Sequence, residues 1–184
     1  MREDRLQLAT RRVYSGKVVR LDVDTVRFPD GSTGELELIR HPGAAAVIPC
    51  ATDPGLGDPT ILMIRQFRYA AGGLLWEIPA GTLAPGEAPE AGARRELLEE
   101  AGVTAERVEP LTSVWTTPGF TDETIHLFWA HGLTRGIPAR EPDEFIEVVP
   151  RPLSEVLAGI AGGEIRDAKT MVAILYMARF VLGR

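Results

Sequence analysis

The chain has 184 residues, the length of one ordinary domain, and 45% of them are hydrophobic, which is enough to bury a core. Its formal net charge of -6 disfavours nonspecific binding to nucleic acid or to a membrane surface, because both partners are polyanionic. Cys50 is the one cysteine, so no intrachain disulfide can form. The start of the chain is charged where a signal peptide is apolar, and a cytoplasmic location is therefore expected.

The first forty residues predict a small β-structure. Hydrophobic and polar residues alternate over residues 17–28 and again over 35–39, and the Pro-Asp-Gly at 29–31 supplies a turn between them. A hairpin or small meander is expected here. The His-Pro-Gly at 41–43 breaks the pattern, so we expect an N-terminal β-strand arm over residues 1–42 and a main domain over 43–184.

The main domain alternates short apolar runs with helical patterns. Pro89 suits the first turn of a helix and Gly102 suits its end, so residues 88–101 form the clearest predicted helix. The other expected elements are strands at 44–50, 60–67, 74–79, 108–115, 124–130 and 145–149, and helices at 153–161 and 168–182. Such an order predicts an α/β or α+β sandwich, with a sheet between helices.

Three glutamates stand close together on the predicted helix. Residues three and four apart share one helix face, so Glu96, Glu99 and Glu100 project together and repel one another. Arg95, four residues before Glu99 and close to Glu87 in the preceding loop, can clamp a carboxylate in one orientation. A solvated acidic face is the ordinary interpretation of such a cluster. A divalent cation held among the carboxylates is the functional one.

The surrounding residues favour the functional interpretation. They fill every fixed position of the pattern G-x5-E-x7-R-E-U-x-E-E-x-G-U, in which U is aliphatic. The matching residues are Gly81, Glu87, Arg95, Glu96, Leu97, Glu99, Glu100, Gly102 and Val103. This segment resembles the signature of the Nudix hydrolases, and the resemblance implies a Nudix fold with a mixed sheet between helices.

The segments around the signature resemble the ADP-ribose pyrophosphatase branch of that family. They are HPGAAAVIP, RQFRYAAGG and WEIPAG upstream, and PGFTDETIHLFWA downstream, where Pro118 lies fifteen residues beyond Val103. The resemblance implies that the Ala80 carbonyl joins Glu96, Glu99 and Glu100 as metal ligands, with Mg²⁺ as the cofactor and Mn²⁺ as a substitute.

The same resemblance implies a set of substrate-binding residues. Arg68 is expected to reach a phosphate or the terminal ribose; Arg65, three residues away on the same strand, is expected to be a surface charge. Trp76 is expected to pack rather than to stack on a ligand. The remaining substrate-side candidates are Glu77, Gly119, Phe120 and Glu123. Phe120, in a turn, can meet a base or pack against the protein, and Glu123 can be a ligand-side carboxylate or the start of a strand. The tryptophan that stacks adenine in relatives has no evident match; Tyr14 or Phe28 can take its place.

Hydrolysis requires a proton acceptor near the attacking water. In this branch the base comes from a mobile acidic loop, which residues 141–149 resemble, and Glu144 is therefore the expected base. Glu99 is the competing base, and an acidic loop without a chemical role is the alternative. The three histidines, His41, His126 and His131, are expected to be structural.

The expected reaction is Mg²⁺-dependent cleavage of ADP-ribose to AMP and ribose 5-phosphate. Another nucleoside diphosphate sugar, such as a GDP-hexose, is the alternative substrate, and a non-catalytic module that senses nucleotides is the alternative class of protein. Relatives in this branch are homodimers whose N-terminal arms cross between subunits, so a homodimer is expected. No nucleic-acid or membrane partner is expected.

Overall fold

The computed structural model describes residues 6–55, 57–137 and 145–183, and the chain divides into two compact units. Unit 1 comprises Met1–Gly43 together with Trp115–Thr124, and unit 2 comprises Ala44–Val114 and Ile125–Arg184. In the described part of the chain, no helix has the length and apolar character needed to cross a bilayer. The predicted boundary between residues 42 and 43 remains a prediction of domain organisation.

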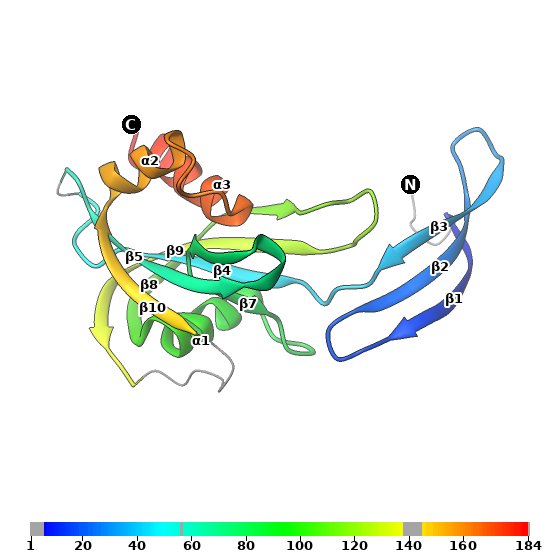
Figure 1. The fold of residues 1–184 in the computed structure, drawn as a ribbon, viewed down its shortest axis with the longest axis horizontal. Coiled ribbons are helices and arrows are strands. Elements are labelled where there is room, and N and C mark those ends of the chain that lie inside the picture. Colours follow the sequence, from blue (N-terminus) through cyan, green and yellow to red (C-terminus); the bar gives the residue numbers. More distant parts are fainter. Residues whose placement is uncertain (1–5, 56, 138–144, 184) are drawn as a thin grey trace. The chain divides into compact units, whose positions relative to one another are not determined.

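Unit 1 contains a three-stranded antiparallel meander, coloured blue in Figure 1. Its strands are β1 (Gln7–Ser15), β2 (Arg20–Arg27) and β3 (Thr33–Ile39). The predicted hairpin corresponds to β2 and β3. The strand β1 was not predicted, because all nine of its residues are exposed and no alternation between buried and exposed positions marks the sequence.

The interior of this meander is polar. Between Gln7 and Ile39 the buried residues are Asp22 and Asp24, which lie on β2. Arg40 pairs with both carboxylates and with Asp122, and Arg12 pairs with Asp22. Ion pairs therefore occupy the place that apolar side chains take in an ordinary core.

Unit 2 contains two sheets. The mixed sheet has the order β7-β4-β9-β8, in which β4 and β9 are parallel, and the antiparallel sheet has the order β10-β5-β6. The strands are β4 (Ala44–Pro49), β5 (Thr60–Arg68), β6 (Gly73–Glu77), β7 (Ala80–Thr82), β8 (Val103–Trp115), β9 (Thr124–Arg135) and β10 (Ile146–Pro152). The predicted strand at 108–115 is thus the C-terminal part of the longer β8, and that at 124–130 is the N-terminal part of the longer β9.

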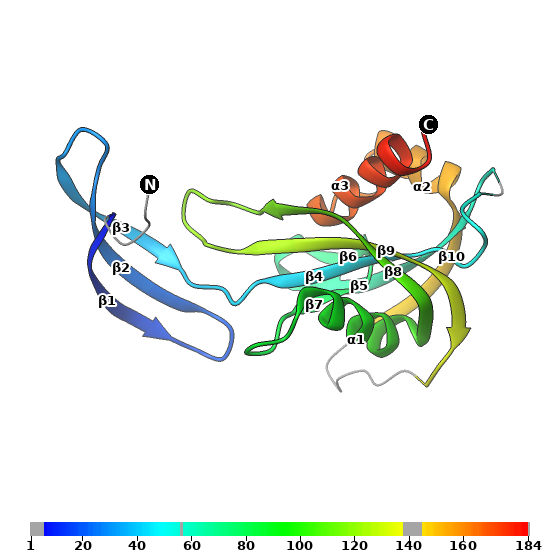
Figure 2. The same ribbon diagram turned by 180° about the vertical axis from the view of Figure 1, so that it is seen from behind.

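Helices cover both faces of the mixed sheet (Figures 1 and 2). Ala45 and Val47 of β4 pack with one face of α1 (Pro89–Ala101) in one core cluster. Ala46 and Ile48 belong to a second cluster with α2 (Leu153–Ala161) and α3 (Ala168–Tyr176). Alternating residues of a central strand are thus buried on opposite faces, as expected for a sheet between helix layers.

The predicted helices agree with the structure, with one difference at the C-terminus. The predicted helix at 153–161 coincides with α2, and that at 88–101 coincides with α1 within one residue. The predicted helix at 168–182 ends as α3 at Tyr176 and continues as a π-helical turn, η3 (Met177–Val181). A short 3₁₀ turn, η2 (Tyr69–Ala71), follows β5.

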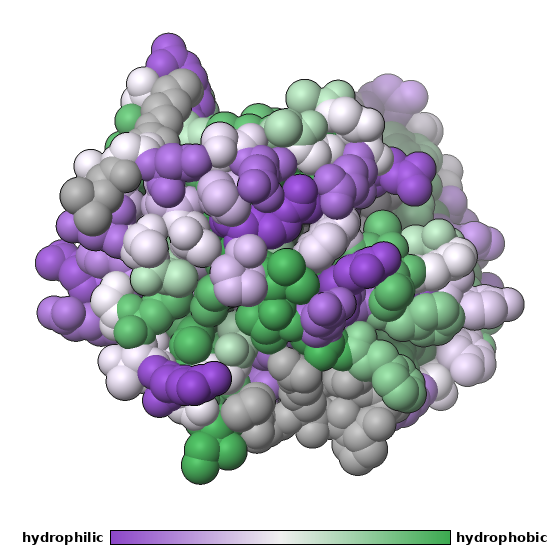
Figure 3. Space-filling model, turned by 60° about the vertical axis from the view of Figure 1, so that its left-hand side comes forward, coloured by the Kyte–Doolittle hydropathy of each residue, from purple (hydrophilic) through white to green (hydrophobic). Residues whose placement is uncertain are grey.

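Hydrophobic side chains also lie on the surface of unit 2. Phe67 and Leu74 are cross-strand partners of β5 and β6 and are about half exposed. On the face drawn in Figure 3, hydrophobic residues in green gather below a band of hydrophilic residues in purple. A folded protein keeps part of its apolar surface exposed to solvent, so such residues are normal.

Candidate active site

The glutamates of the signature are carried by α1. Pro89 is its first residue, where a missing N–H costs no hydrogen bond, and Gly102 ends it with a left-handed backbone (φ 68°). Glu96 and Glu100 are 6% and 2% exposed, whereas the side chain of Glu99 is 33% exposed. Two of the three carboxylates are therefore buried against the fold, and the third lies at its edge.

Arg95 holds the carboxylates around it. Its guanidinium donates from Nε to Glu87 at 2.9 Å, and from Nη1 to Glu96 at 2.6 Å and Glu99 at 2.9 Å. Nη2 also donates to the Thr82 carbonyl at 3.1 Å. The predicted clamp on Glu87 and Glu99 is therefore present, and it extends to Glu96.

The charges in this clamp shift one another's pKa values. Hydrogen bonds from Arg95 and from the backbone N–H of Ala84 lower the pKa of Glu87 from 4.5 to about 2. The hydrogen bonds that Arg95 donates to Glu87 raise the pKa of Arg95 despite its partial burial. Both groups stay ionised at neutral pH, so the clamp persists under the conditions in which an enzyme works.

Strand β7 approaches α1 closely at two points. The backbone N–H of Ala80 donates to Glu100 Oε2 at 2.8 Å. At the next residue, a Cβ added to Gly81 would lie 2.0 Å from Glu96 Oε1, so glycine leaves room for this carboxylate in its present position. Glu100 and Glu96 therefore lie beside two consecutive residues of β7, Ala80 and Gly81.

This donor set fits a hard divalent cation. Carboxylate and carbonyl oxygens are the ligands that Mg²⁺ and Mn²⁺ prefer. Among residues 6–55, 57–137 and 145–183, no three His, Cys, Asp or Glu side chains are already arranged around one metal position. The guanidinium of Arg95 lies against both Glu96 and Glu99. The case for a metal site therefore depends on the oxygen donors and on the space that Gly81, without a Cβ, leaves for the Glu96 carboxylate.

A second charged group lies on the neighbouring strands β5 and β6. Arg68 donates to both oxygens of Glu77, from Nε at 2.8 Å and from Nη2 at 3.0 Å. Lys169 of α3 donates to the same carboxylate. Burial alone would raise the pKa of Glu77, but the hydrogen bonds of Arg68 and the charge of Lys169 lower it. Glu77 is 1% exposed and thus orients Arg68; a direct contact of Glu77 with substrate remains a prediction.

Lys169 was not identified from the sequence. It lies in an Asp-Ala-Lys-Thr segment at the start of α3, where Asp167 caps the helix by accepting from the Thr170 N–H at 3.0 Å. Lys169 also pairs with Asp167 at 3.0 Å. The Asp-x-x-Thr spacing predicts a helix start, but nothing local in the sequence points to Glu77.

Arg65 and Arg68 lie on opposite faces of β5, as expected for residues three apart on a strand. Arg65 lies over the ring of Trp76, with 5.6 Å from its Cζ to the ring centroid, and Arg151 lies over the same ring at 5.0 Å. Trp76 packs against the core cluster of α2 and α3. The expected packing role of Trp76 is confirmed.

The remaining predicted site residues belong to unit 1 or lie outside the described residues. Gly119, Phe120 and Glu123 belong to unit 1, as do Tyr14 and Phe28. In that unit Phe120 is 52% exposed, and Glu123 accepts from Thr116 Oγ1 at 2.8 Å. Their substrate-binding roles remain predictions. Glu144 lies outside the described residues.

The predicted structural histidines all have a polar partner. His41 Nδ1 accepts from the Gly43 N–H at 3.1 Å within unit 1. In unit 2, His126 is 2.7 Å from Ser113 Oγ, and His131 Nε2 is 3.3 Å from Glu109.

Comparison with known proteins places this geometry in a family. The NUDIX domain model matches residues 40–172. The chain is 42% identical to an ADP-ribose pyrophosphatase of Bacillus subtilis (strain 168) over 92% of this chain and 90% of that protein. It is 41% identical, with the same coverage, to a methanol dehydrogenase activator of Bacillus methanolicus.

A solved structure supports the fold independently. The crystal structure of an ADP compounds hydrolase superimposes with a TM-score of 0.79 over 96% of this chain and 94% of that chain, at 20% identity. The predicted mixed sheet between helices is thereby confirmed. With the complete signature on β7 and α1, the chain belongs to the Nudix hydrolase family, in the branch that contains ADP-ribose pyrophosphatases.

Proposed function

We propose that this chain hydrolyses the pyrophosphate bond of ADP-ribose to AMP and ribose 5-phosphate, with Mg²⁺ as the cofactor. The observation that carries the proposal is the arrangement of Glu96 and Glu100 against Ala80 and Gly81, with Arg95 fixing the carboxylates. The 42% identity to an ADP-ribose pyrophosphatase over most of both chains supports this choice of substrate.

Glu96, Glu99, Glu100 and the Ala80 carbonyl would hold the metal. Nudix hydrolases generally use a divalent metal, and oxygen donors of this kind suit Mg²⁺ with Mn²⁺ as a substitute. When bound, such an ion neutralises phosphate charge and lowers the pKa of water. The chain's own contribution is to keep these carboxylates ionised and oriented through Arg95 and the Ala80 N–H.

Arg68 would bind a phosphate of the substrate. Its side chain is 42% exposed, so donors remain accessible while Glu77 holds the guanidinium in one orientation. Lys169 shares Glu77 and balances its buried charge. Gly119, Phe120 and Glu123 would contact the nucleoside or ribose side of the substrate.

In the chemical step, the oxygen of a water molecule attacks one phosphorus atom and the bond from that phosphorus to the bridging oxygen breaks. A base takes the proton of the water, and the leaving phosphate carries the released electron pair. We propose Glu144 as this base, with Glu99 as the competitor. Glu99 is partly exposed and accepts from Arg95 at 2.9 Å, so it is already oriented for such a role.

The test is hydrolysis of ADP-ribose in ¹⁸O-labelled water with Mg²⁺, followed by mass spectrometry of both products. AMP and ribose 5-phosphate are expected as products, with the label in one of them, which identifies the phosphorus attacked. GDP-mannose in a parallel reaction is expected to be cleaved more slowly. Absence of cleavage of ADP-ribose with either Mg²⁺ or Mn²⁺ would refute the proposal.

We also propose that the chain works as a homodimer in the cytoplasm. The described part of the meander buries two aspartates and leaves large hydrophobic side chains exposed, so it needs a partner surface. The exposed side chains are those of Leu6, Leu8, Val13, Tyr14, Val18, Val19, Phe28 and Leu36. Light scattering is expected to give twice the chain mass of 20.0 kDa, whereas a monomer mass would refute the dimer. The single, buried Cys50 is compatible with a reducing compartment.

A further inference from the structure

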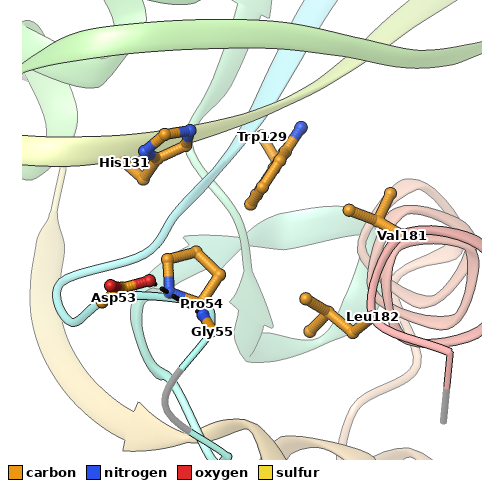
Figure 4. Close-up of a pocket in the computed structure, with 7 residues that line it drawn as sticks. All are labelled: Asp53, Pro54, Gly55, Trp129, His131, Val181 and Leu182. Carbon is orange, nitrogen blue, oxygen red and sulfur yellow. Dashed lines mark hydrogen bonds between the residues drawn. The ribbon is translucent and has the colours of Figure 1, made fainter.

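A cavity of about 390 Å³ lies in unit 2 among the β4–β5 loop, β9 and the C-terminal turn η3. Figure 4 shows Trp129 and His131 projecting from β9 on one side and Asp53 with Pro54 on the loop opposite. Val181 and the adjoining Leu182 close a third side. The volume is within the range of small-molecule sites, about 300–1,000 Å³.

This cavity is separate from the glutamates of α1. Strand β7, which carries Ala80, pairs with Ala44–Ala46 at the beginning of β4. The loop with Asp53 follows the other end of β4, and Trp129 pairs with Ile48 near that end. The proposed active site and the cavity are thus at opposite ends of one central strand.

The aromatic wall is held in place. The rings of Trp129 and His131 lie 4.9 Å apart between centroids, tilted by 38°. His131 Nε2 is 3.3 Å from Glu109, which also pairs with Arg107 at 3.2 Å. The two rings therefore form a fixed π-surface beside the apolar side chains of η3.

The charge in the cavity is negative. The walls contain Asp53 and, among the described residues that line them, no Lys or Arg. Asp53 Oδ1 accepts from the Gly55 N–H at 2.8 Å, which fixes the carboxylate at the mouth of the cavity. A second cavity of about 460 Å³ shares Asp53, Pro54 and His131 and widens the site along the same loop.

We propose that this cavity binds a small organic cation of the alkylammonium class, with the charged group between the Trp129 ring and the Asp53 carboxylate. An indole face attracts an ammonium group through its quadrupole, and tryptophan is the strongest of the aromatic residues in this respect. The carboxylate supplies the counter-charge, and Val181 and Leu182 contact the alkyl part. The described residues of these walls offer an anionic ligand no Lys or Arg side chain.

The test is titration of the full chain with choline, observed through the indole N–H signals in ¹H–¹⁵N NMR spectra. The chain has three tryptophans, so Trp76 and Trp115 act as internal controls, and Trp129→Phe assigns the remaining signal. Choline is expected to shift the Trp129 signal saturably and to leave the other two signals unchanged. The uncharged analogue 3,3-dimethylbutan-1-ol is expected to bind several-fold more weakly.

Asp53→Asn removes the charge while its amide oxygen can still accept from the Gly55 N–H. This variant is expected to bind choline about fivefold more weakly and the uncharged analogue as the wild type does. Asp30→Asn is the matched control, because Asp30 also accepts from a nearby backbone N–H (Ser32, 2.9 Å) but belongs to unit 1. Equal affinity for choline and its uncharged analogue, or a Trp129 signal that does not respond, would overturn the proposal.

Discussion

Each unit of the molecule has an arginine surrounded by carboxylates, and the two clusters differ in the balance of charge. In unit 2, Arg95 contacts Glu87, Glu96 and Glu99. In unit 1, Arg40 contacts Asp22, Asp24 and Asp122, and Arg12 contacts Asp22 as well. The ion pairs described here thus join one guanidinium to three carboxylates in the first cluster and two guanidinium groups to three carboxylates in the second.

This difference supports the proposal of a cation site around Arg95 and of a structural ion-pair network around Arg40. Around Arg95 the described ion pairs set three carboxylates against one guanidinium, so a divalent cation would have an electrostatic role there. Around Arg40 the charges nearly balance, and the buried Asp22 and Asp24 are compensated by the protein itself. Whether a cluster of carboxylates indicates a metal site therefore depends on how many arginine and lysine side chains pair with it.

The largest expected effect is that of Glu100→Gln. The amide oxygen can still accept from the Ala80 N–H, so the fold should persist, while the charge that would hold the metal is lost. Hydrolysis of ADP-ribose is expected to fall by about a hundredfold or more, measured as kcat with saturating Mg²⁺.

Glu90→Gln is the matched control for this variant. Glu90 lies on the same helix and pairs with Arg94, and its side chain is 53% exposed. Its kcat is expected to equal that of the wild type. If Glu100→Gln and Glu90→Gln had the same kcat, the proposed metal site at Glu100 would be refuted.

Gly81→Ala tests the cradle for Glu96. The added Cβ would lie 2.0 Å from Glu96 Oε1 and 2.3 Å from Cδ, so the carboxylate must move. Displacement of a group that orients a metal ligand typically costs about 10–100-fold in activity or metal affinity, and a loss in that range is expected here. Gly73→Ala is the control, since a Cβ there meets nothing within 4 Å, and its activity should be unchanged.

The sequence predicted those features whose residues are close together along the chain. The signature on β7 and α1 lies within residues 81–103, so its spacing alone placed Glu87, Arg95 and Glu99 together. Pro89 and Gly102 marked the ends of α1 for the same reason, because helix-end signals act within one turn. The family resemblance added the fold and the reaction class.

Features that depend on distant residues were not predicted. Lys169 meets Glu77 across 92 positions, and Arg40 meets Asp122 across 82, so no local pattern connects them. Strand β1 has no buried face in unit 1, and β7 is three residues long, so neither produces a periodic signal. Tertiary pairing decides these cases, and only the structure reveals it.

Arg40→Gln tests the network in unit 1. The variant leaves Asp22 and Asp24 buried with less compensating charge, so the free energy of unfolding is expected to fall. We expect a loss of about 2 kcal/mol in urea denaturation, below the value for a fully buried pair because the Arg40 side chain is 29% exposed. Arg27→Gln, on β2 with one long hydrogen bond to Gly31, should cost little. A loss of activity without a loss of stability would contradict the structural role.

The smallest expected effect is on the stability of the fold at acid pH, through Glu87. The pKa of Glu87 is about 2 in the folded chain against an ordinary value of 4.5, so its ionised form favours folding. The contribution of Glu87 to the free energy of unfolding is complete above about pH 4.5, and it is lost as the pH falls toward about 2. Glu87→Gln should therefore melt at a lower temperature than the wild type at neutral pH, and the difference should shrink through that range. If the difference in melting temperature stayed constant down to about pH 2, Arg95 would not stabilise the ionised form of Glu87 as the structure indicates.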